Sequence, residues 1–154
     1  AGMRSLIAYN KRLGQAQAVF ERRADNLQAA LERIASDTGS MSATVDDHIT
    51  QHAGSIFDFK VDDIFYANKG RIYVYYLVLR ELGHDYEAVI RERNMATVWN
   101  QMVDSFRTAS QLEPLVVMNG RPDSQVIPSH LAAQGFYLMR ARFQLYEAIN
   151  ILLK

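Results

Sequence analysis

The chain has 154 residues, is 49% hydrophobic and carries no formal net charge at pH 7, since 17 Lys and Arg residues balance 17 Asp and Glu residues. This length suits a single domain with one core. The neutral balance gives no general attraction to nucleic-acid phosphates, so we expect no nucleic-acid partner. The absence of cysteine excludes disulfides, thiol nucleophiles and cysteine-ligated metal sites. No motif calls for a cofactor, and we expect none.

Apolar residues recur every seven positions near the start of the chain, at Leu6, Leu13, Phe20, Leu27 and Ile34. This spacing predicts one long helix over residues 3–36, whose apolar stripe needs another helix to cover it. The covering helix lies either in the same domain, the interpretation we favour, or in a second chain. Because Ala1 and Gly2 precede Met3 and the pattern then begins at once, we also expect a fragment of a longer chain.

Small and polar residues follow, and they predict a loop over residues 37–60. Within it lies a cluster of metal-ligand types, Asp46, Asp47, His48 and His52. Two histidines four positions apart on a helical turn can direct both imidazoles at one cation, with carboxylates beside them. The alternative interpretation is an ordinary solvated loop, because the cluster lacks the glutamate of a metalloprotease helix.

A second helix is predicted from Asp62 and Asp63, whose carboxylates suit a helix N-terminus, to Gly83. Residues 72–79 also have strand propensity, but helical spacing on both sides favours a helix. A catalytic carboxylate pair is the weaker explanation of the two aspartates, because adjacent residues point about 100° apart on a helix.

Tyrosines surround this second helix, among them Tyr66 and Tyr73. If their rings are exposed, these two residues are candidates for ligand binding or protein interaction. The alternative is an enclosed helix whose phenols find hydrogen bonds at the edge of the core.

A third helix is predicted over residues 84–113, then a small hairpin or extended insertion over 115–127, then a last helix over 129–152. The inward face of the last helix is predicted to contain Leu131, Gly135, Leu138, Met139, Leu145, Tyr146, Ile149 and Leu152. The predicted fold is therefore all-α, a single antiparallel bundle of about four long helices in which residues 61–154 supply three.

Two further residues of the last helix are candidate site residues. Arg142 lies on the apolar side, so it needs a route to water, an anionic ligand, or an acidic partner. The candidate acidic partners are Asp62, Asp63 and Asp104. His130 stands at the helix N-terminus, where Asn119 and Arg121 complete a small-ligand pocket if the insertion folds back. The alternative is a histidine that only hydrogen-bonds a neighbouring loop.

Three short motifs carry a family resemblance: Asp62-Asp63-Ile64-Phe65-Tyr66, Met118-Asn119-Gly120 and Pro128-Ser129-His130. With them, about residues 60–154 resemble the C-terminal part of an uncharacterised bacterial envelope family, a domain of unknown function. The resemblance implies a membrane-spanning anchor upstream, in the bacterial inner membrane, and a mostly helical region on its periplasmic side. It implies no established activity. The residues after Gly120 depart from the glycine-rich continuation expected of that family.

Two functions follow as hypotheses. The first is a non-enzymatic helical interaction or scaffold domain, which binds a protein partner or a second copy of itself. The second is a metal- or small-ligand-binding helical domain with hydrolytic activity, centred on the Asp46 to His52 cluster or on His130. No stretch of this chain is long and apolar enough to span a membrane.

Overall fold

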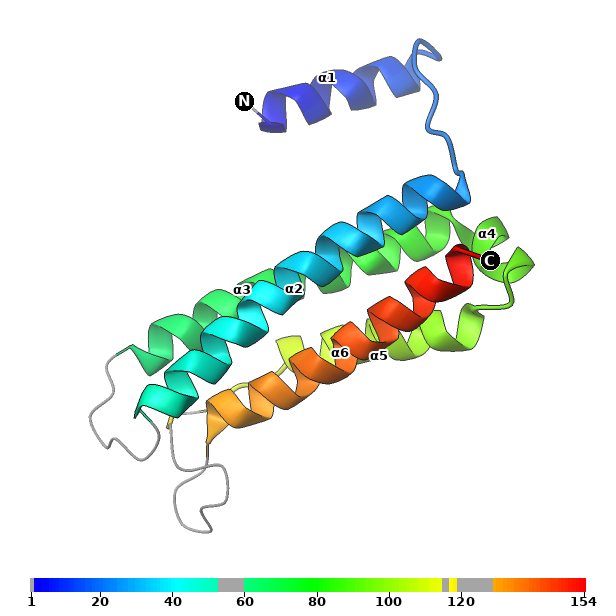
Figure 1. The fold of residues 1–154 in the computed structure, drawn as a ribbon. Helices are drawn as coiled ribbons and strands as arrows, with labels where there is room; N and C mark the ends of the chain where they lie inside the picture. Colours follow the sequence, from blue (N-terminus) through cyan, green and yellow to red (C-terminus); the bar gives the residue numbers. More distant parts are fainter. Residues whose placement is uncertain (1, 53–59, 115–116, 119–128) are drawn as a thin grey trace.

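The computed structural model describes residues 2–52, 60–114, 117–118 and 129–154. The elements within these ranges are helices: α1 (Gly2–Gly14), α2 (Ala24–His52), α3 (Val61–Asp85), α4 (Glu87–Glu92), α5 (Ala96–Ser110) and α6 (His130–Leu152). Four of them, α2, α3, α5 and α6, run alternately in opposite directions (Figure 1). Each packs against its two neighbours in the order α2, α3, α5, α6 and back to α2. The predicted all-α antiparallel bundle is confirmed.

The core lies along the axis of this bundle and is supplied by all four long helices. Its most enclosed side chains are spaced three, four or seven residues apart on each helix, so that each helix presents one apolar stripe inward. They include Leu27 and Leu31 from α2, Phe65, Ile72 and Leu79 from α3, Met102 and Phe106 from α5, and Leu138 and Leu145 from α6.

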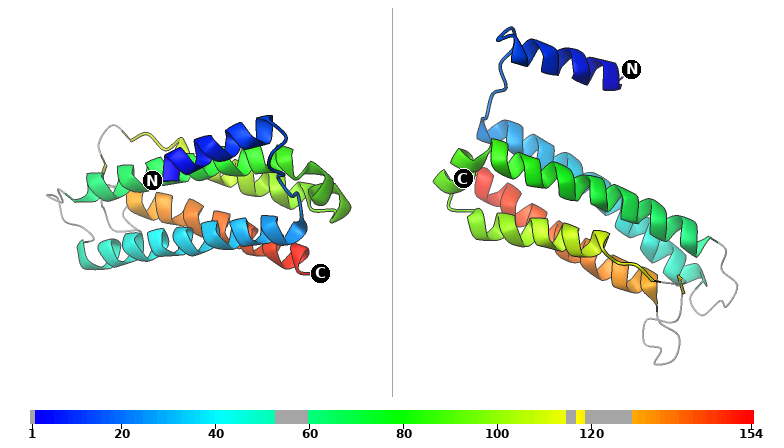
Figure 2. Two further views of the ribbon diagram at one scale, coloured as in Figure 1. Left: turned by 90° about the horizontal axis from the view of Figure 1, so that it is seen from above. Right: turned by 180° about the vertical axis from the view of Figure 1, so that it is seen from behind.

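The predicted continuous helix over residues 3–36 is wrong, because the chain leaves the helical conformation after Gly14. Ala16 has a left-handed φ of 55°, and residues 15–23 are not helical. The break separates the heptad ladder into two parts: Leu27 is fully buried in the core, whereas Leu6 is 65% exposed. Helix α1 buries none of its residues and stands apart from the four long helices (Figure 2, right).

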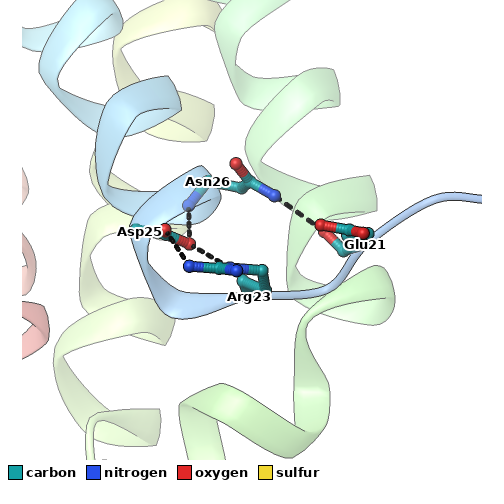
Figure 3. Close-up of polar contacts among 4 residues, drawn as sticks. All are labelled: Glu21, Arg23, Asp25 and Asn26. Carbon is teal, nitrogen blue, oxygen red and sulfur yellow. Dashed lines mark hydrogen bonds and ion pairs between the residues drawn. The ribbon is translucent and has the colours of Figure 1, made fainter.

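The start of α2 is held by polar contacts at the surface (Figure 3). Arg23 donates from Nε and Nη2 to the two carboxylate oxygens of Asp25, at 3.0 and 2.7 Å. These bonds hold the pKa of the Asp25 carboxyl below its ordinary value. Asn26 donates from Nδ2 to the backbone oxygen of Glu21, at 3.1 Å, and so ties the preceding segment to the first turn.

The predicted loop over residues 37–60 is also wrong as far as residue 52, because α2 continues to His52. The hydroxyl of Thr38 donates to the Ile34 carbonyl at 2.6 Å, and the hydroxyl of Ser42 donates to the Thr38 carbonyl at 3.1 Å. Both residues are buried, and Met41 and Val45 continue the inward stripe. Polar side chains that bond the preceding turn are therefore compatible with a buried helix here.

The predicted third helix is divided into α4 and α5, since Asn94 has a left-handed φ of 52°. Gly83 does not end α3, which continues to Asp85. Its role is to make room: a Cβ added at Gly83 would lie 2.6 Å from Nε1 of the buried Trp99. Absence of a side chain at this position lets α3 and α5 approach each other closely.

The last helix begins and ends close to the predicted bounds. Ser129 is its N-cap, with the side-chain oxygen accepting from the backbone N–H of Ala132 at 3.2 Å. Gly135 packs on α2, where an added Cβ would lie 3.4 Å from Cγ1 of Val45. The predicted hairpin over residues 115–127 falls almost wholly outside the described residues.

Polar groups in the core also link α3 to α6. Gln134 is fully buried and donates from Nε2 to the Phe65 carbonyl at 3.0 Å. Its Oε1 accepts from Nδ2 of the buried Asn68 at 3.4 Å.

Among the helices that the structure describes, none has the length and apolarity needed to cross a membrane.

Candidate functional site

Helix α6 has a second apolar face, directed away from the core. The residues Phe136, Met139, Phe143, Tyr146 and Leu153 are each between 47% and 77% exposed. With the exposed Asn150 they follow alternating steps of three and four residues, which place side chains on one face of a helix. We call these six residues the outer face of α6. The prediction that Met139 and Tyr146 point inward is therefore wrong.

Seven of the nine buried residues of α6 form a separate ladder with the same steps: Leu131, Gln134, Leu138, Ala141, Leu145, Ala148 and Leu152. The other two, Gln144 and Ile149, lie beside this ladder. At about 100° per residue this ladder lies on the side of the helix roughly opposite the outer face. The helix is thus apolar on two sides, and the bundle covers only one of them. A helix that is apolar all round is normally buried on all sides.

A groove of about 380 Å³ separates the outer face from α2. Its walls include Ser42, Asp46 and Ile49 from α2, and Gly135, Phe136, Met139 and Arg142 from α6. The groove continues the outer face sideways, so a segment lying on α6 would also contact the edge of α2.

Arg142 lies in this groove, and the structure does not pair it with the acidic residues predicted for it. Asp62 and Asp63 are exposed in the first turn of α3, and Asp104 pairs with Arg107 at 2.9 Å. The Arg142 guanidinium instead lies against Gly39, where an added Cβ would be 3.6 Å from Nη2. Its Nε is buried and has no hydrogen-bond partner within the described residues.

The Asp46, Asp47, His48 and His52 cluster lies on the last turns of α2, not in a loop. The two imidazoles are stacked, with ring centroids 4.5 Å apart and an interplanar angle of 14°. His48 is buried and His52 is exposed. Within the described ranges, no three His, Cys, Asp or Glu side chains are arranged to hold a metal ion. Metal binding by this cluster stays a prediction.

Tyr66 and Tyr73 line a cleft of about 660 Å³ between α3 and the end of α5. Both rings are about half exposed, and Tyr76 contributes a third ring to the same cleft. At its edge Lys69 pairs with Glu113 at 3.0 Å. The structure thus brings the two predicted tyrosines to one concave surface, while Tyr75 points elsewhere and packs edge-on against Phe106.

His130 makes two contacts with the short segment before α6. Its backbone N–H donates to the Met118 carbonyl at 2.9 Å, and its Nδ1 accepts from the Met118 N–H at 2.9 Å. These reciprocal bonds hold residue 118 against the start of the helix. Asn119, the predicted companion of His130, lies outside the described residues.

The outer face of α6 is the feature that the sequence predictions missed. Its signal was present in the sequence, because Phe136, Met139, Phe143 and Tyr146 already follow the three-and-four spacing. The leucines of the same helix repeat every seven residues, and only the structure shows which of the two ladders is buried.

Comparison with curated proteins gives no match, and comparison with solved structures gives none either. Residues 48–153 match a family described as an uncharacterized protein conserved in bacteria. This range is more than half of the chain, and it includes the part of α2 that bears His48 and His52 together with all of α3 to α6. The family resemblance of the three short motifs is confirmed, and the chain belongs to the DUF2333 family of uncharacterised bacterial proteins.

Proposed function

We propose that this chain is a non-enzymatic interaction domain that uses the outer face of α6 to bind another helix. The observation that carries this proposal is the row of five large apolar side chains, each at least 47% exposed, on one side of a single helix. Scattered exposed apolar residues are normal on a protein surface, but a contiguous patch usually marks an interaction site. The three-and-four spacing suits a partner helix, whose side chains can fit between these residues.

The test is photo-cross-linking in a bacterium that produces the whole protein. A photoreactive phenylalanine analogue replaces Phe143, which is 77% exposed at the centre of the outer face. The matched control carries the analogue at Asn100, an exposed position on α5. We expect a discrete protein adduct from position 143 only, and its loss when Met139→Glu is added. Equal adducts from both positions, or no adduct from position 143, would contradict the proposal.

We further propose that the domain belongs to the bacterial envelope and that an anchor lies upstream of residue 1. The resemblance to an envelope family supports this location. Helix α1 supports it too, since it carries Arg4, Lys11 and Arg12, contains no acidic residue and exposes Met3, Leu6 and Ile7. A basic amphipathic helix suits the surface of an anionic membrane. Fractionation of the full-length protein should place it in the salt-washed membrane pellet, and recovery in the soluble fraction would contradict this location.

The cleft between α3 and α5 favours a second candidate function, the binding of a small molecule. Its volume of about 660 Å³ lies within the range of ligand pockets, and tyrosines and Lys69 supply apolar surface with polar groups. A native mass spectrum of the purified chain should then show a small-molecule adduct that Tyr73→Ala removes. A spectrum without an adduct, or an adduct that survives this substitution, would leave the interaction domain as the better function.

A further inference from the structure

We propose that the outer face of α6 pairs with the same face of a second copy of this chain, with the two α6 helices antiparallel. This inference rests on the proposed function and names the partner helix. The outer face extends from Phe136 to Leu153, the residue directly after the last turn of α6, a length of about 26 Å at 1.5 Å per residue. Its average repeat of 3.5 residues is the spacing of two helices that pack along a common seam.

A second copy supplies a partner with the same spacing and the same length. An interface formed by one surface and its own copy has two-fold symmetry, in which residue i contacts residue j and residue j contacts residue i. In two antiparallel helices the residue numbers rise along one helix while they fall along the other. The numbers of any two facing residues therefore add up to the same value. A sum of 289 matches every member of the outer face with another member: Phe143 with Tyr146, Met139 with Asn150, and Phe136 with Leu153.

This register places the rings of Phe143 and Tyr146 at the centre, where they are best shielded from water. Phe143 is the most exposed large side chain of the helix, at 77%, so it gains most from being covered. Asn150 is the single polar member of the seam. One polar residue in an apolar seam limits the registers that two helices can adopt.

The charged residues beside the seam favour the antiparallel arrangement. Arg140 and Glu147 flank the outer face on the same side and are exposed. Neither takes part in an ion pair between described residues. The numbers 140 and 147 add up to 287, which is two less than the sum of 289 for directly facing residues. Each Arg140 would therefore lie near Glu147 of the second copy, and this pair would occur twice in one dimer. In a parallel pair, Arg140 would instead face Gly135. Antiparallel helix dipoles also attract each other.

The natural absence of cysteine allows a direct test of this register. Met139→Cys and Asn150→Cys are made as separate single variants, and each is oxidised alone and then as a mixture. In the antiparallel pair, position 139 lies opposite position 150 of the other copy, within reach of a disulfide. Position 139 of the second copy lies 11 residues further along that helix, about 16 Å away, which is too far for a disulfide bond between the two cysteines at position 139.

We expect the mixture to form a disulfide-linked heterodimer about tenfold more efficiently than either single variant, as the distance limit on disulfides requires. Asn100→Cys is the control for random collision, and Phe143→Glu in both chains should abolish the link while the melting temperature is retained. Self-linked dimers of each single variant would indicate parallel helices and overturn the register. No link above the collision control would overturn the second copy as the partner, whereas the photo-cross-link to a different protein would still support the interaction domain.

Discussion

Tyr75 of α3 donates its phenolic hydrogen to a carboxylate oxygen of Asp37 on α2. The bond joins two helices of the bundle at a half-buried position. Burial, followed by this hydrogen bond, raises the pKa of Tyr75 to about 12. The native protein therefore keeps this proton at pH values where an unfolded tyrosine, with its ordinary pKa of 10.0, has lost it.

The first prediction concerns this bond. Tyr75→Phe should lower the free energy of unfolding by about 1–2 kcal/mol at pH 7, because it removes a hydrogen bond to a charged group. A raised native pKa contributes stability that is complete below pH 10 and lost as the pH rises toward 12. Urea unfolding should therefore show a smaller loss between these pH values for Tyr75→Phe than for the wild type. Tyr73→Phe, at an exposed tyrosine of the same helix, is the control, and equal alkaline losses in all three proteins would contradict the prediction.

The second prediction compares two glycines of α3. Gly83→Ala should lower the free energy of unfolding by about 1–3 kcal/mol, since the new Cβ would overlap the buried Trp99 ring. Gly70 has nothing within 4 Å of an added Cβ, so Gly70→Ala should stabilise the helix by up to about 1 kcal/mol. Urea unfolding measures both. The fluorescence of the single tryptophan should shift only in Gly83→Ala, and a stabilised Gly83→Ala protein would refute the close approach of α3 and α5.

The third prediction concerns the buried amides of α3 and α6. Gln134→Leu leaves the Asn68 amide without its acceptor and should destabilise the protein by about 1–3 kcal/mol. Replacing both residues by leucine removes the unsatisfied amide as well, so the double variant should recover much of the loss. A double-mutant cycle from urea unfolding gives the coupling energy. Purely additive losses would mean that the two side chains do not interact.

The sequence predicts best those helices in which residues typical of helix ends stand where the apolar spacing begins and stops. The apolar spacing predicts the start of α6 to within one residue. It predicts α3 because helical spacing on both sides outweighs the strand propensity of residues 72–79. α2 beyond residue 36 was missed because Thr38 and Ser42 are polar, although both are buried and bond the preceding turn.

The other errors have tertiary causes. A perfect heptad ladder crosses the break near Ala16, so periodicity alone gives no sign of the non-helical residues 15–23. Gly83 resembles a helix terminator in the sequence, but the structure needs a glycine there because the Trp99 ring of α5 leaves no room for a side chain. For the candidate sites, Tyr66 and Tyr73 were identified from residue type, whereas their shared cleft depends on how α5 packs beside α3.

The fourth prediction concerns the start of α6. His130→Ala removes the acceptor for the Met118 N–H, so this amide should exchange its hydrogen with water faster than in the wild type. Hydrogen exchange followed by mass spectrometry measures the change. Amides in the centre of α3 serve as the internal reference and should keep their rates. An unchanged rate at Met118 would mean that the reciprocal bonds do not hold this segment.

The most direct test of the central claim, that the outer face of α6 is a binding surface and that its partner is a second copy, is sedimentation equilibrium of the purified chain. Wild type and Phe143→Glu are compared up to about 100 µM, a range that covers an interface of modest area. We predict that the wild type approaches twice its monomer mass of 17.5 kDa and that Phe143→Glu remains monomeric with an unchanged helical content. A monomeric wild type, or a dimer that Phe143→Glu leaves intact, would contradict pairing through this face.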